Sequence, residues 1–202
     1  MMLRCFLGFW SGRRCMRALG LVLVLAMWGL QSASATDLWD RLRSDRYVLL
    51  MRHAYAPGLG DPSGYSLHRC ETQRNLNPQG LVQAEGIGQW LRSQGVLSAQ
   101  VYSSIWCRCQ QTAERLKYGP VTIEPALASF FDQPQQASPQ TRALEQLIAR
   151  KLIDKGDRAL ILVTHHVNIE AYMGRAIGSG DMVLAQVTPQ GRVIDFVIYP
   201  SP

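Results

Sequence analysis

Two histidines and two arginines, placed where apolar runs of the sequence end, are its residues best suited to chemistry. Arg52 and His53 follow the apolar run Tyr47–Met51, His165 follows a second such run, and Arg108 comes shortly after a third. A guanidinium fork binds phosphate oxygens in pairs, and an imidazole can attack phosphorus to form a covalent phosphoenzyme. These residue types together indicate a phosphate group held beside a nucleophile.

The elements that must position these residues alternate between strands and helices. Residues 159–164 are the clearest strand, because they are continuously hydrophobic, as a strand covered on both faces should be. Asn77-Pro78 and Ser138-Pro139 each read as a capping residue followed by proline at a helix start. We predict strands at residues 47–51, 100–104, 121–124, 159–164, 183–187 and 193–198 and helices at residues 37–45, 78–92, 106–118, 138–152 and 166–175.

This alternation predicts an α/β fold, a three-layer α/β/α sandwich with a mostly parallel mixed sheet in a single domain. The last two predicted strands are separated by a short Pro-Gln-Gly turn, so we expect them to form a closing hairpin. Right-handed crossovers place the ends of successive parallel strands at the same edge of the sheet. We therefore expect Arg52, His53, Arg108 and His165 to converge there, where open α/β sheets bind ligands.

Residues 1–35 have the composition of an export signal. A basic leader precedes the apolar run Ala18–Leu30, whose thirteen residues fall short of the roughly 20 that span a bilayer. The small residues Ala33-Ser34-Ala35 then match a signal-peptidase site. We predict a signal peptide over residues 1–35 and a catalytic domain over residues 36–202, periplasmic or secreted and free of the membrane after cleavage. An uncleaved membrane anchor is the alternative.

Most of the excess positive charge of the chain lies in this leader. The formal net charge is +6, and the leader holds four of the 21 basic residues and none of the 15 acidic ones. Residues 36–202 therefore carry a net charge of only +2, and we expect no nucleic-acid partner. We also expect no metal or other cofactor, because the histidines lie at separate strand ends and the arginines beside them repel cations.

Three cysteines lie outside the leader, namely Cys70, Cys107 and Cys109. Disulfides persist in the oxidising compartments to which export leads, so one bridge and one free thiol is the simplest expectation. Cys70 can pair with Cys107 or with Cys109, whereas a bond between Cys107 and Cys109 would close a very tight loop. We favour Cys70–Cys107 and leave the other pairing open.

Four motifs in order along the chain carry a family resemblance. They are Met-Arg-His-Ala at residues 51–54, Asn-Pro-Gln-Gly-Leu-Val-Gln-Ala at residues 77–84, the segment from Ser-Ser to Thr-Ala-Glu at residues 103–114, and Leu-Val-Thr-His at residues 162–165. The chain resembles the histidine phosphatase superfamily, also called phosphoglycerate-mutase-like, over nearly all of residues 36–202. Its Gln-Arg-Asn-Leu segment at residues 73–76 is similar to that of exported members.

This resemblance implies a phosphatase in which His53 is the phosphorylated nucleophile. Arg52 and Arg108 would bind the phosphate, and His165 would complete the pocket. His166 has the weaker claim to that role, because His165 directly follows the strand, although the backbone N–H of His166 can contribute. The substrate would be a small-molecule phosphate ester or another phosphorylated compound. A catalytically weakened phospho-ligand-binding protein and a phosphomutase are the alternatives.

The sequence departs from the family pattern at two places. Ala54 stands where the family signature has glycine, and no clear general acid is present. Asp132 is the favoured candidate for the acid, followed by Glu124 and Glu170. A missing acid would favour leaving groups that depart easily, such as those of phosphoramidates, acyl phosphates and aryl phosphates, since an alkoxide needs a proton.

The long irregular stretch over residues 54–77 is the part of the chain most suited to choosing the substrate. It is rich in glycine and proline, and a loop of this length in a compact domain is usually functional or disordered. Arg74 is the residue that we expect to bind substrate there, with Arg69 as the alternative. The sequence gives neither the physiological substrate nor the oligomeric state.

Overall fold

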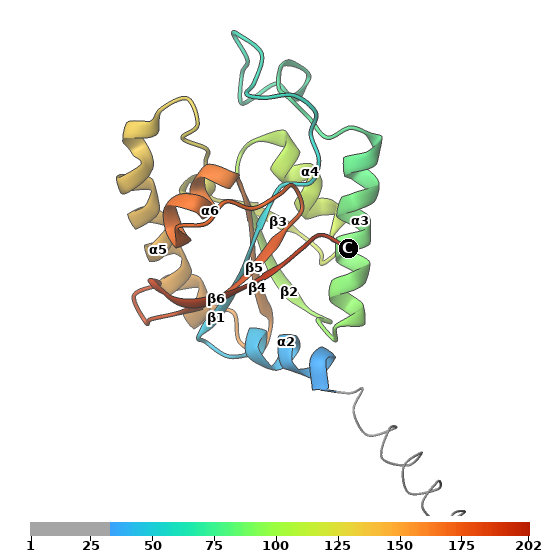
Figure 1. Cartoon of the computed structure of the whole chain (residues 1–202), viewed down its shortest axis with the longest axis vertical. Coiled ribbons are helices and arrows are strands. Elements are labelled where there is room, and N and C mark those ends of the chain that lie inside the picture. Colours follow the sequence, from blue (N-terminus) through green and yellow to red (C-terminus); the bar gives the residue numbers. More distant parts are fainter. Residues whose placement is uncertain (1–32) are drawn as a thin grey trace, which may run out of the picture. The chain divides into compact units, whose positions relative to one another are not determined.

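Six apolar runs of the sequence form one mixed β-sheet in a computed structural model, which describes residues 33–202 (Figure 1). The strands are β1 (Tyr47–Arg52), β2 (Ala99–Ser103), β3 (Val121–Ile123), β4 (Ala159–Thr164), β5 (Met182–Val187) and β6 (Val193–Tyr199). Their order in the sheet is β3-β2-β4-β1-β5-β6. The first four in this order run parallel, and the predicted hairpin of β5 and β6 adds two antiparallel strands beside β1.

Helices cover both faces of this sheet (Figure 1). The helices are α2 (Ala33–Arg43), α3 (Pro78–Ser93), α4 (Cys107–Arg115), α5 (Ala137–Asp154) and α6 (His166–Met173). Residues of α3 and α4 share one buried apolar cluster with the sheet, and residues of α5 and α6 share a second. The predicted three-layer α/β/α sandwich with a mostly parallel mixed sheet is therefore confirmed.

Strand β1 shows how the sequence builds both clusters. Successive side chains of a strand point to opposite faces of its sheet. Leu49 and Met51 accordingly pack into the cluster with α3 and α4, while Val48 and Leu50 pack into the cluster with α5 and α6. All four are fully buried, and each such side chain contributes roughly 1.5–3 kcal/mol on burial. A strand that is apolar on both faces is thereby fixed in the interior, with Arg52 at its end.

The start of α3 lies against the segment that leaves β1. The Asn77 side chain accepts a hydrogen bond from the Gly80 N–H at 2.9 Å, so the predicted cap is confirmed. A Cβ atom at Gly80 would overlap with the backbone carbonyl of Tyr55, and one at Gly88 would lie 2.6 Å from the Leu116 carbonyl oxygen. Glycine at these two positions allows α3 to pack directly against the backbone near His53 and against the end of α4.

Two helices begin earlier than predicted. Helix α5 begins at Ala137, not at Ser138, because a 3₁₀ turn over Pro134–Gln136 runs directly into it and leaves Gln136 with helical backbone angles. The predicted Ser138 cap is therefore wrong, and the Ser138 hydroxyl instead accepts a hydrogen bond from Arg142 one turn later. Helix α2 begins at Ala33, four residues before its predicted start.

The predicted signal peptide, residues 1–35, lies almost wholly outside the described residues. Its predicted cleavage site coincides with the first turn of α2. Within residues 33–202, no helix combines the length and the apolar character that crossing a bilayer requires.

Candidate active site

The three predicted strand-to-helix junctions meet at one cavity over the carboxyl ends of β2, β4 and β1, which are neighbours in the sheet. His53 follows β1, His165 follows β4, and Arg108 lies in the first turn of α4 after β2. The space inside is about 40 Å³, enough to hold a water molecule. All five predicted site residues line it, namely Arg52, His53, Arg74, Arg108 and His165.

The position of His53 is fixed by backbone and ring hydrogen bonds. Its N–H donates to the Thr164 carbonyl at 3.0 Å, and its carbonyl accepts from the Gly180 N–H at 3.1 Å. Its ring Nδ1 lies 2.7 Å from the Ala54 carbonyl oxygen, which can only accept, so Nδ1 carries the proton. The lone pair of the neutral ring is then on Nε2, which has no hydrogen-bond partner within residues 33–202.

Burial and charge both keep this imidazole neutral. Removal from water is the main cause that holds the pKa of His53 well below its usual range, and the positive charges of Arg108 and Arg52 lower it further. The hydrogen bond to the Ala54 carbonyl acts in the opposite direction. His53 is 1% exposed. A neutral imidazole with a free Nε2 is the form in which histidine acts as a nucleophile.

His165 is the second buried imidazole of the cavity. Its Nε2 lies 2.9 Å from the Ser104 hydroxyl and 3.5 Å from the Cys109 sulfur, and its ring centre is 5.6 Å from that of His53. Burial, then the charge of Arg108, lowers the pKa of His165 well below its usual range. His166, the first residue of α6, also lines the cavity but is only half-buried.

Arg52 and Arg108 each have one nitrogen held by the protein and another without a partner. The Arg52 Nη1 donates to the Ile177 carbonyl at 3.0 Å, and the Arg108 Nη1 donates to Asp61 at 2.9 Å and 3.1 Å. The Nε of each arginine is buried and makes no hydrogen bond to the described residues. Unsatisfied buried donors are costly and rare, so this pair indicates a site for an anion.

The departure from glycine at Ala54 causes no strain. Among the described residues, Lys117 alone combines a side chain with a positive φ, so Ala54 has an ordinary backbone conformation. Its N–H donates to the Thr112 hydroxyl at 3.0 Å, and that hydroxyl donates to the Arg108 carbonyl at 2.7 Å. Thr112, a residue of the third family motif, therefore links the turn after His53 to the helix that carries Arg108.

Asp61 is a cavity residue that the sequence analysis missed. Its carboxylate accepts hydrogen bonds from Arg108, from the Trp106 Nε1 at 3.0 Å and from the Arg74 backbone N–H at 2.9 Å. The signal was present, because Asp61 is the only carboxylate between His53 and Cys70 in a chain that gathers several arginines at one place. Arginines gathered in one partly buried cavity need a counter-charge, and the long loop supplies it.

Arg74 lines the cavity, but part of its side chain serves the loop. Its Nε donates to the Gly60 carbonyl at 2.8 Å and its Nη1 donates to the Ala56 carbonyl at 2.6 Å. These bonds hold the segment between Ala56 and Asp61 against the site. The predicted role of Arg74 in binding substrate stays a prediction.

A disulfide between Cys70 and Cys107 ties the same loop to the start of α4, as favoured from the sequence. The Cys107 backbone N–H also donates to the Gln73 side chain at 3.0 Å. Cys109 is the free thiol, and burial raises its pKa to about 12. The loop and the residue next to Arg108 are therefore covalently joined.

The three candidates for the general acid lie in different surroundings. Asp132 lines the cavity at its exposed rim, 3.4 Å from the Tyr65 hydroxyl. Glu124 does not line the cavity and pairs with Lys151 at 3.0 Å, and Glu170 is exposed on α6 away from the lining. Within residues 33–202, no group of three or more His, Cys, Asp or Glu side chains is arranged to hold a metal ion.

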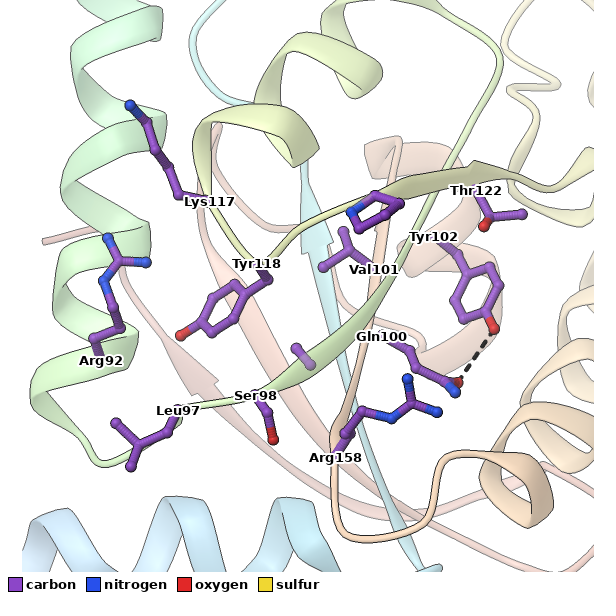
Figure 2. A pocket seen from close by; sticks show the side chains of 12 residues that line it. Arg92, Leu97, Ser98, Gln100, Val101, Tyr102, Lys117, Tyr118, Thr122 and Arg158 are labelled. Atoms are coloured by element: carbon purple, nitrogen blue, oxygen red, sulfur yellow. Dashed lines mark hydrogen bonds between the residues drawn. The ribbon is translucent and has the colours of Figure 1, made fainter.

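A larger hollow of about 550 Å³ lies beside the amino-terminal part of β2 (Figure 2). Its lining includes Arg92, Lys117 and Arg158 but no histidine, cysteine or carboxylate. The Arg92 and Arg158 side chains already donate to backbone carbonyls, at 2.8 Å and 3.1 Å. This hollow therefore has positive charge but none of the predicted site residues, which line the cavity around His53 instead.

The comparison with protein families gives one match. Residues 48–132 match the model of the histidine phosphatase superfamily (branch 1), the same family that the sequence motifs resemble. The matched range includes Arg52, His53 and Arg108, and it ends before His165. No curated protein sequence matches the chain significantly.

Solved structures of two phosphatases and a hydrolase share the fold. The protein histidine phosphatase SixA complexed with tungstate is 16% identical, with a TM-score of 0.52 over 76% of this chain and 94% of that one. A mycobacterial glucosyl-3-phosphoglycerate phosphatase is 14% identical, with a TM-score of 0.55 over 77% and 97%. Mycobacterial hydrolase 1 is 15% identical, with a TM-score of 0.55 over 77% and 98%. At these identities the likeness shows the fold alone.

The two buried imidazoles predict how stability depends on pH. An unfolded histidine binds a proton near pH 6.5, whereas His53 and His165 stay neutral in the folded protein well below that pH. The unfolded state then binds more protons, so the free energy of unfolding should fall below about pH 6.5, by up to about 1.4 kcal/mol per pH unit for each histidine. Urea unfolding at pH 7.5, 6.5 and 5.5 measures this fall. The His165→Asn variant should show a smaller fall, and an equal fall in both proteins would contradict the assignment.

Proposed function

We propose that this chain, which has the sequence signature and the fold of the histidine phosphatase superfamily, is a phosphatase that works through a phosphohistidine on His53. Its substrates are phosphate esters or phosphoramidates, with the phosphoryl group held by Arg52, Arg108 and His165. One observation carries the proposal. A neutral histidine with an unpaired Nε2 lies in a small cavity with two arginines whose Nε donors are buried without a partner.

The first half of the reaction follows from this arrangement. The His53 Nε2 lone pair attacks phosphorus, the bond from phosphorus to the leaving group breaks, and the leaving group takes the bonding electron pair and a proton. The ring gains positive charge as the N–P bond forms, and the Nδ1–H bond to the Ala54 carbonyl stabilises that charge. The two arginines hold the equatorial oxygens and offset their negative charge.

The second half returns the enzyme to its starting state. A water molecule attacks phosphorus, the N–P bond breaks, and the electron pair returns to the His53 Nε2. Inorganic phosphate then leaves, and the proton lost by the water goes to a nearby base or to solvent. His165 supports both steps by its position, since its ring lies 5.6 Å from that of His53 and contacts the Ser104 hydroxyl.

Within residues 33–202, the cavity has no buried acid beside His53 that is an obvious proton donor for the leaving group. Asp132 is the candidate that lines the cavity, and it lies at the exposed rim, where water reaches it as well. Asp61 also lines the cavity, but its carboxylate oxygens already accept hydrogen bonds from Arg108, the Trp106 Nε1 and the Arg74 backbone N–H. We therefore propose Asp132 or water as the proton donor, with a preference for leaving groups that depart easily.

The phosphoenzyme is the direct test of this function. Purified protein mixed with ³²P-labelled aryl phosphate and quenched rapidly in alkali should carry a label that is stable to base and lost in acid, as a phosphohistidine is. The His53→Asn variant should carry no label and lose turnover, whereas His68→Asn, a change at an exposed histidine of the loop, should keep both. Label retained in His53→Asn would contradict the mechanism. Phosphate binding without label or turnover would favour a phospho-ligand-binding protein.

The leaving group separates the two sources of the proton. We expect kcat/KM for an aryl phosphate to exceed that for a sugar phosphate, because an alkoxide needs protonation in the transition state. If Asp132 is the donor, Asp132→Asn should lower kcat/KM for the sugar phosphate by about 100-fold or more and change that for the aryl phosphate little. Glu124→Gln serves as the control and should change neither. Efficient sugar-phosphate hydrolysis that survives Asp132→Asn would rule out Asp132.

We also propose that the protein is exported to the periplasm or secreted. The basic leader, its short apolar run and the small residues up to Ala35 support this, and so does the disulfide between Cys70 and Cys107. Protein recovered from the exported fraction of a bacterial host should begin at Thr36 by intact mass. Recovery only of uncleaved chain from the membrane would favour the anchor instead.

A further inference from the structure

The long loop places a buried carboxylate on the arginine that is proposed to bind phosphate. The side chains of Asp61 and Arg108 are only 4% and 5% exposed, and the Arg108 Nη1 lies 2.9 Å and 3.1 Å from the two carboxylate oxygens. Ion pairs are seldom buried to this degree, because removing both charges from water costs free energy. A surface pair of the same length would contribute little.

The contacts divide the guanidinium group into two parts. Within residues 33–202, all hydrogen bonds of the Arg108 side chain use Nη1, which also donates to the Arg74 carbonyl at 3.3 Å. The Nε is buried and has no partner. Asp61 therefore holds the Nη1 atom of the Arg108 guanidinium group and leaves its other nitrogens free for a ligand.

Asp61 is itself held by groups that do not belong to Arg108. The Trp106 Nε1 donates to one carboxylate oxygen at 3.0 Å, and the Arg74 backbone N–H donates to the other at 2.9 Å. Arg74 also fixes the preceding loop residues, and the Cys70–Cys107 disulfide joins the loop to the residue before Arg108. The carboxylate thus has a fixed position before any ligand arrives.

We infer that Asp61 is a positioning residue, which fixes the Arg108 guanidinium group in the orientation that binds the phosphoryl group. The inference rests on the proposed function, because it concerns the affinity of the same cavity for a phosphate. A free arginine side chain loses conformational entropy when it is ordered, and a prior anchor removes that cost from binding. Asp61 also offsets the mutual repulsion of Arg52, Arg74 and Arg108 in the empty cavity.

The same contact has a second interpretation with the opposite sign. If the carboxylate occupied the place of the phosphate on Arg108, a ligand would have to displace it, and removing its charge would tighten binding. The free nitrogens of Arg108 favour positioning over displacement, because a phosphate can bind them while Asp61 stays in place.

Direct binding of inorganic phosphate and of tungstate, measured by calorimetry on the purified protein, distinguishes these interpretations. Asp61→Asn should weaken both by about 10- to 100-fold, the size of effect seen for outer partners of metal ligands. In turnover of an aryl phosphate, it should raise KM more than it lowers kcat. Asp157→Asn, at a carboxylate that is 86% exposed, should have no effect. Tighter binding in Asp61→Asn would overturn the inference.

A double-mutant cycle with Arg108→Gln shows whether Asp61 acts through that arginine. Arg108→Gln should weaken phosphate binding by itself, and Asp61→Asn added to it should weaken binding less than about threefold further. Equal effects of Asp61→Asn in both backgrounds would mean a general structural role and would contradict the inference. Wild-type phosphate affinity in Arg108→Gln would instead contradict the proposed function.

Trp106→Phe provides a second test if Asp61→Asn folds poorly. It keeps an aromatic ring at the position beside His165, from which the Trp106 ring centre is 5.2 Å away, and removes the N–H that donates to Asp61 together with part of the indole ring. Phosphate binding should weaken by about threefold to tenfold, which is less than the full effect of one hydrogen bond to a charged group, because this bond acts on Arg108 only through Asp61. Unchanged or tighter binding in a folded Trp106→Phe variant would count against positioning by Asp61.

Discussion

The site depends on the burial of positive charge at one edge of the sheet. Arg52 and Arg108 lie beside two imidazoles. Burial and the charges of both arginines lower the pKa of His53, and burial and the charge of Arg108 lower that of His165. One buried carboxylate, Asp61, offsets part of this charge, and two buried Nε donors remain without partners in residues 33–202. The uncompensated positive charge destabilises the empty site, and an anion bound there compensates it. The fold has already taken these groups out of water, so a bound phosphoryl group interacts with charges that need no further rearrangement.

Three neighbouring parallel strands and the long loop over residues 54–77 hold these charged groups together. Arg108, His165 and His53 follow the neighbouring strands β2, β4 and β1 and therefore lie at the same edge of the sheet. The buried apolar residues of these strands fix the strands in the interior and so fix the positions of the three side chains. Thr112 links the turn after His53 to α4, and the Cys70–Cys107 disulfide joins the loop to the same helix. The positions of His53 and Arg108 are therefore coupled, and a shift of α4 would displace both the proposed nucleophile and the arginine.

Much of this could be predicted from the sequence, because strand ends at parallel junctions are a strong pattern. The runs before His53 and His165, the cap at Asn77 and the meeting of His53, Arg108 and His165 at one edge of the sheet follow from local rules of periodicity and capping. Asp61 could not be predicted in the same way, since its partner Arg108 lies 47 residues away and only the folded loop joins them. The early start of α5 escaped prediction for a related reason, because a 3₁₀ turn replaced the expected side-chain cap.

The central claim is that the cavity around His53 is where a phosphoryl group binds. A crystal structure of the protein with tungstate tests it most directly, because tungsten gives strong, unambiguous density and the anion resembles phosphate in shape. We expect tungstate within hydrogen-bonding distance of Arg52 and Arg108, with tungsten facing the His53 Nε2. Tungstate bound instead in the hollow beside Arg92 and Lys117, with none in the cavity at saturating concentration, would contradict the claim.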